Sequence, residues 1–92
     1  MDNNSFYLKI EEGVREWVYK LRNHGINTEC SCHHDGYIQC QTLDPTEEIR
    51  IIKSVLMENN VEDFNIVITI TSWKFATLVI RSPHFIFKNK NQ

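Results

Sequence analysis

A short segment between residues 30 and 40 gathers the side chains best suited to chemistry. It holds all three cysteines of the chain, two histidines and one aspartate: Cys30, Cys32, His33, His34, Asp35 and Cys40. Thiolates and imidazoles are the ligands that zinc prefers, and two thiolates on one strand could hold a soft ion such as Cu(I). One hypothesis is therefore a zinc or copper site at Cys30, Cys32 and Cys40.

The spacing of these cysteines favours a plainer role. Two residues apart on a strand, Cys30 and Cys32 have Cα atoms about 6.5–7 Å apart, wider than ligands paired in a tight zinc turn. Free cysteine is also among the most frequently buried residue types. We expect three core side chains and no bound cofactor. A redox-responsive pair, with a disulfide between Cys30 and Cys40 under oxidation, is the third alternative.

The chain has no recognisable catalytic motif. With three glycines it contains no Gly-rich phosphate loop, GxSxG elbow or HExxH helix. A core-facing thiol would lack both the activating base and the solvent access that a nucleophile needs. We therefore predict no catalytic residues and no enzymatic activity.

The elements that position the cysteines form a predicted hairpin. A three-residue loop, His34-Asp35-Gly36, would pair Cys32 with Ile38 and Cys30 with Cys40. One face then carries Thr28, Cys30, Cys32, Ile38 and Cys40, and the other carries Glu29, Ser31, His33, Tyr37, Gln39 and Gln41. A two-residue loop would instead set Ser31 and His33 beside Ile38. That register buries more polar groups, so we prefer the first.

Apolar residues at helical spacing predict two helices. The first covers residues 5–24, with Gly25 ending it so that Ile26 packs over Leu21; a strand over residues 6–10 is an alternative. The second begins at Asp44-Pro45, with Glu47 reaching back to the cap, and ends at Asn59-Asn60.

A second hairpin follows the second helix. Large apolar residues alternate with smaller or polar ones over 64–71, where Phe64, Ile66, Ile68 and Ile70 are interleaved with Asn65, Val67, Thr69 and Thr71. A second alternating run over 76–81 ends before Pro83. The order helix–strand–strand, twice, predicts an α+β fold. We expect a two-layer αββαββ arrangement, a permuted ferredoxin-like topology with two helices on one face of a four-stranded antiparallel sheet. One domain would span residues 1–92, with residues 1–4 and 88–92 frayed.

The open face of this sheet is the predicted interaction surface. It would carry Ser31, His33, Tyr37, Gln39, Thr69, Phe75, Thr77, Val79 and Arg81, with Trp73 at the hairpin tip. We expect Trp73 to fold back on the core, with anchoring of a partner as the alternative. Because Arg81 is the only base on this face, nucleic acid is disfavoured as a partner. We predict a binding module that associates with itself or with another protein. The segment 84–88 is expected to pack on its own domain, with strand pairing as the alternative.

Composition limits the remaining classes of protein. Ten basic and twelve acidic residues give a net charge of -2, which argues against a basic nucleic-acid arm or a membrane-binding patch. Three cysteines do not make a secreted disulfide scaffold, and neither a signal peptide nor a membrane-spanning run is evident. We therefore expect a cytoplasmic protein.

The first hairpin also resembles that of a group of small uncharacterised bacterial proteins. The likeness rests on Asn27-Thr28-Glu29-Cys30-Ser31-Cys32, His34 and Tyr37-Ile38-Gln39-Cys40, and covers about residues 14–58. The resemblance implies a helix on either side of the hairpin. It implies no activity.

Overall fold

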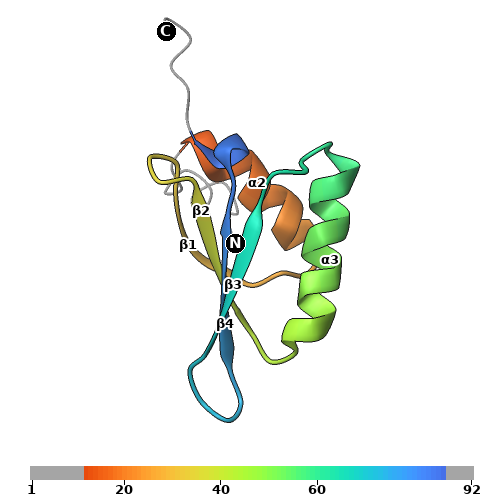
Figure 1. Cartoon of the computed structure of the whole chain (residues 1–92), viewed down its shortest axis with the longest axis vertical. Coiled ribbons are helices and arrows are strands. Elements are labelled where there is room, and N and C mark those ends of the chain that lie inside the picture. Colours follow the sequence, from red (N-terminus) through yellow and green to blue (C-terminus); the bar gives the residue numbers. More distant parts are fainter. Residues whose placement is uncertain (1–11, 87–92) are drawn as a thin grey trace, which may run out of the picture.

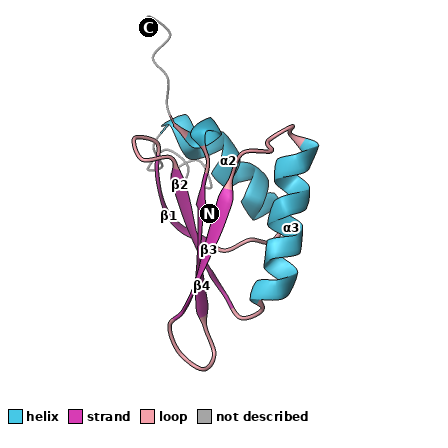
Figure 2. Cartoon of the chain, viewed as in Figure 1, coloured by secondary structure: helices cyan, strands magenta, loops and turns pink. Residues whose placement is uncertain are grey.

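The structure, a computed structural model, describes residues 12–86. Its elements are α2 (Glu12–Asn23), β1 (Thr28–Cys32), β2 (Tyr37–Thr42), α3 (Pro45–Glu58), β3 (Asn65–Ile70), β4 (Ala76–Arg81) and a 3-10 helix, η1 (Pro83–Phe85). The predicted α+β order is confirmed (Figures 1 and 2). The alternatives for residues 5–11, helix or strand, lie outside the described residues.

The four strands form one antiparallel sheet in the order β1-β2-β4-β3. Both helices lie on the same side of this sheet, which gives two layers (Figure 1). The two central strands, β2 and β4, come from different hairpins, so their pairing joins the two halves of the chain. β1 and β3 are the edges.

The end of α2 forms as predicted. Gly25 adopts a φ of +87°, and the Ile26 N–H donates to the Leu21 carbonyl at 3.1 Å, while the Gly25 N–H donates to the Arg22 carbonyl. These two bonds define the Schellman arrangement, which a left-handed residue makes possible. Ile26 is thereby buried over Leu21.

The end of α3 repeats this geometry with asparagine in place of glycine. Asn60 has a φ of +63°, and the Val61 N–H donates to the Leu56 carbonyl at 2.9 Å. Asparagine tolerates the left-handed region better than most residues, so it can serve as the helix stop. Val61 is thereby brought over Leu56, and both residues are buried.

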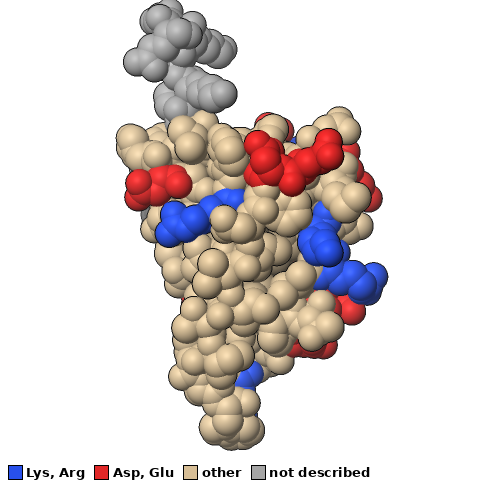
Figure 3. Space-filling model, viewed as in Figure 1, with Lys and Arg blue, Asp and Glu red and all other residues tan. Residues whose placement is uncertain are grey.

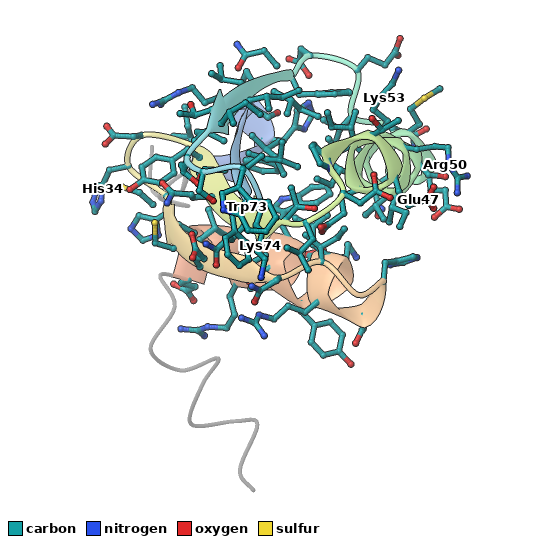
Figure 4. All side chains as sticks on the ribbon, turned by 90° about the horizontal axis from the view of Figure 1, so that it is seen from below. His34, Glu47, Arg50, Lys53, Trp73 and Lys74 are labelled. Carbon is teal, nitrogen blue, oxygen red and sulfur yellow. The ribbon has the colours of Figure 1, made fainter. Side chains whose placement is uncertain are left out.

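At the start of α3, only one of the two predicted capping hydrogen bonds forms. Asp44 Oδ1 accepts the Glu47 N–H at 3.2 Å, and Pro45 occupies the first turn. The predicted return bond from Glu47 is wrong. Its carboxylate pairs with Arg50 on the outer side of α3 (Figure 4), and the Asp44 N–H donates to Thr42 Oγ1 at 2.9 Å. The threonine satisfies the donor that the glutamate was expected to satisfy.

The core fills the space between the helices and the sheet. Alternate residues of the central strands point into it, and they meet three buried residues from each helix: Ile38, Cys40, Leu78, Ile80, Val14, Val18, Leu21, Ile52, Val55 and Leu56. Phe85 of η1 is also fully buried, with its ring centroid 5.5 Å from that of Trp17.

The segment after β4 therefore packs on its own domain at Phe85, as expected. Pro83 to Phe85 form a 3-10 helix, so the alternative of an edge strand is wrong for these residues. Phe87 and Lys88 lie outside the described part of the chain.

Candidate interaction surface

The register of the first hairpin differs from the predicted one. Cys32 pairs with Tyr37 and Ser31 with Ile38, which leaves a four-residue turn in place of the expected three. The side chains near the turn therefore alternate as they would with the two-residue loop. That arrangement seemed less favourable because it points polar side chains toward the core. A bulge between Thr28 and Cys30 shifts the register back, so that Thr28 still lies opposite Cys40 on the core side.

The bulge divides the three cysteines between the two faces of the sheet. Cys40 is fully buried, Cys32 is half-buried and Cys30 is exposed on the open face, so the prediction of one shared face is wrong. The core role is confirmed for Cys40 alone. Cys30 pairs with Gln39 and points away from Cys40, so the predicted geometry for a disulfide between them is wrong too.

Cys40 cannot be the third ligand of the hypothesised metal site, because it lies on the opposite face of the sheet from Cys30 and Cys32. Burial raises the pKa of Cys40 from 9.0 to about 12, so its sulfur stays protonated. Among residues 12–86 no group of three potential metal-ligating side chains comes together. What remains on the open face is Cys30 and Cys32, with Asp35 Oδ2 3.8 Å from the Cys32 sulfur.

Two residues expected on the open face lie elsewhere. Ser31 shares the helix side with Ile38. His33 lies in the turn, where its Nδ1 accepts the Gly13 N–H at 2.9 Å. The first N–H groups of a helix have no partner within it, so a nearby imidazole can cap them. His33 therefore positions α2 against the first hairpin, a role for which its place in the sequence gave no signal.

The other strand residues predicted for the open face are placed there. They are Tyr37, Gln39, Thr69, Thr77, Val79 and Arg81, which alternate with buried or helix-facing neighbours. The Arg81 guanidinium lies 5.4 Å from the Tyr37 ring centroid, and Gln39 Nε2 donates to Glu29 Oε1 at 3.4 Å. Coulombic repulsion from Cys30 is the main cause that raises the pKa of Tyr37.

The end of β3 is exposed in a way that alternation could not reveal. Ile68 and Ile70 are on the helix side, where the pattern predicts burial, yet they are 47% and 70% exposed. The β3–β4 hairpin projects beyond the start of α3, so no helix covers its far end (Figure 1). On the opposite face of the same strand Val67 is exposed as well.

The hairpin tip continues this apolar surface. Trp73 is 89% exposed, so the expectation that it folds back on the core is wrong. The Lys74 ammonium lies 5.0 Å from its ring centroid, and both side chains lie at the end of the hairpin (Figure 4). The Ser72 hydroxyl accepts the backbone N–H groups of Lys74 and Phe75, which holds the turn.

We call five exposed side chains the hairpin patch: Val67, Ile68, Ile70, Trp73 and Phe75. In Figure 3 the surface around β3 and the hairpin is almost entirely uncharged, whereas acidic and basic side chains gather toward the other end of the molecule. The sequence signals for this patch were Trp73 at a turn and the lack of charge over residues 65–70.

No helix within residues 12–86 has the length and apolar character needed to span a bilayer. The chain matches no family model, no curated protein and no solved structure.

Proposed function

We propose that this chain is a non-enzymatic protein-binding domain that uses the hairpin patch and the adjoining open sheet face. The observation that carries the proposal is that five large apolar side chains of one hairpin are exposed, on both of its faces and at its tip, and that none of them belongs to the core. Apolar residues scattered singly over a surface are ordinary, but contiguous ones mark interaction sites.

The chemistry of the patch suits a protein partner. Each square ångström of apolar surface removed from water contributes about 25 cal/mol, so aromatic and branched side chains give the largest gain on association. Tryptophan is among the residues that most often dominate protein interfaces. Nucleic acid fits poorly, because Arg81 is the only arginine or lysine on the strands of the open face and phosphate binding requires more positive charge.

A photocrosslinking experiment in cells tests the proposal. Benzoylphenylalanine placed at Phe75 should form adducts with a protein, either a second copy or another chain. The matched control is the same amino acid at Met57, which is apolar and exposed on α3 but outside the patch. Equal adduct yields at the two positions, or none at Phe75, would overturn the proposal.

A second candidate function rests on the two thiols that reach the open face together. Cys30 and Cys32 lie on one strand, and Asp35 Oδ2 is 3.8 Å from the Cys32 sulfur; the two thiols could bind Zn²⁺ or Cu(I), or respond to oxidation. Such free thiols suit a reducing compartment such as the cytoplasm. Metal analysis of protein purified without chelator tests the site. Stoichiometric metal lost in a C30S/C32S variant and retained in C40A supports it, and metal-free wild type opposes it.

A further inference from the structure

We infer that β3 pairs edge to edge, in antiparallel orientation, with β3 of a second copy of this chain, centred on Ile68. This inference rests on the proposed function and names its partner. It joins two four-stranded sheets into one.

The backbone of β3 offers the groups that such pairing needs. The Thr71 N–H donates to the Phe75 carbonyl at 3.1 Å, which makes these opposite residues a hydrogen-bonded pair. Such pairs alternate along an antiparallel ladder, so Thr69 and Val67 also direct their peptide groups toward β4. The N–H and C=O groups between them, on three isoleucines, therefore face outward: Ile66, Ile68 and Ile70. Within residues 12–86 no strand pairs with this edge.

The two edges of the sheet are protected very differently. β1 is interrupted by the bulge, carries Glu29, and has its Thr28 carbonyl and hydroxyl occupied by Arg22 at 2.6 and 2.7 Å. Bulges and charges are the usual means of preventing edge pairing. β3 has neither, because residues 65–70 are uncharged and pair with β4 without a register shift.

The register of β3 is self-complementary about Ile68. A two-fold axis at this residue and perpendicular to the sheet sets Ile68 against its own copy and Ile66 against Ile70, each pair exchanging two N–H···O bonds. Opposite side chains of an antiparallel pair lie on the same side, so the exposed isoleucines of both copies meet on the helix side. The isoleucine surface that α2 and α3 leave uncovered is then covered by the same surface of the second copy.

Charge complementarity supports the same register. Pairing about Ile68 carries each hairpin tip, which holds Lys74, toward the segment that precedes the other copy's β3 and holds the exposed Glu62 and Asp63. The surface between these two ends is nearly uncharged (Figure 3). The two-fold axis forms this contact once at each end of the interface.

Sedimentation equilibrium from micromolar to millimolar concentration tests the pairing. The wild-type chain should reach twice the monomer mass, and I68K, which places a charge at the centre of the edge, should remain monomeric. M57K is the matched control, because it puts the same charge at an exposed apolar residue of α3, outside the hairpin patch and the open sheet face; it should still dimerise. Circular dichroism checks folding, and I70K replaces I68K if the latter unfolds.

A charge exchange tests the register. K74E and E62K should each weaken the dimer, and the K74E/E62K double variant should regain it; failure of this rescue overturns pairing about Ile68. A monomeric wild type, or loss of the dimer in M57K but not in I68K, overturns edge pairing altogether. If a monomeric wild type still gives crosslinks at Phe75 to another protein, this inference fails while the proposed function stands.

Discussion

At the scale of single residues, the environments of the three cysteines divide their reactivity. Cys30 is exposed and Cys32 half-buried, whereas Cys40 is enclosed by the core. We expect iodoacetamide to modify Cys30 and Cys32 in the native protein and Cys40 only after unfolding, because alkylation requires an accessible thiolate. Peptide mass spectrometry measures the three rates. Native labelling of Cys40 as fast as that of Cys30 would contradict the fold of the first hairpin.

The buried thiol also makes stability depend on pH. Because the pKa of Cys40 rises from 9.0 to about 12 on folding, the unfolded chain loses this proton first. Its contribution is fully present below pH 9 and falls as pH rises toward 12, by about 1.4 kcal/mol for each pH unit. Urea unfolding between pH 8 and pH 11 should show a smaller decline in C40A than in the wild type. C30S is the control and should follow the wild type.

Two glycines give a matched test of local packing. Gly36 and Gly25 both have positive φ, but a Cβ at Gly36 would lie 2.9 Å from the Ser82 carbonyl oxygen and 2.7 Å from Ile86 Cγ1, while at Gly25 it would meet nothing. G25A should cost about 1 kcal/mol of unfolding free energy through backbone strain alone. G36A should cost about 2–4 kcal/mol, because overlap with backbone is added. Equal losses in urea unfolding would contradict the close approach at Gly36.

The positions of the residues on the open sheet face could be predicted from the sequence only in part. Alternation placed Tyr37 and Val79 correctly because strands have a period of two. It misplaced Cys30 and His33, because one extra residue in β1 exchanges the faces on which the side chains after it lie. Nothing in the local sequence predicts that bulge. Trp73 was identified by position, but its exposure depends on what lies over the hairpin.

At the scale of elements, the start of α3 should depend on Asp44 more than on Glu47. D44A removes the oxygen that accepts the Glu47 N–H, and we expect a loss of about 1 kcal/mol. E47A removes only an exposed pair with Arg50, so its loss should be about half as large or less. Thermal and urea unfolding give both values. A larger loss in E47A than in D44A would instead support the predicted hydrogen bond between the Glu47 side chain and the Asp44 N–H, which in the structure donates to Thr42.

The ends of both helices and the start of α3 were the most predictable boundaries, because their signals are local. Gly25 and Asn60 stop helices through their own backbone preferences, and Asp44 caps through its own side chain. The burial of β3 was not predictable in this way. Its alternation fits a covered strand, but whether a helix reaches Ile68 and Ile70 depends on the lengths and angles of other elements.

At the scale of the whole molecule, the strand order predicts a gradient of protection from exchange. β2 and β4 are bonded on both sides, so their amide hydrogens should exchange most slowly in dilute solution. Along β3, Val67 and Thr69 should exchange more slowly than Ile66, Ile68 and Ile70, whose N–H groups face outward. Amide exchange measured by NMR resolves each residue. Uniform protection along β3 in the monomer would contradict the assigned ladder.

The irregular edge strand β1 sets a limit on the size of any assembly. A sheet that could add copies through both edges would grow head to tail into a fibre, since each addition exposes a new template. The bulge at Thr28 and Cys30, with Arg22 on the Thr28 carbonyl, closes that route. Any association through β3 would therefore end at two copies, because the protected β1 edge cannot add a third.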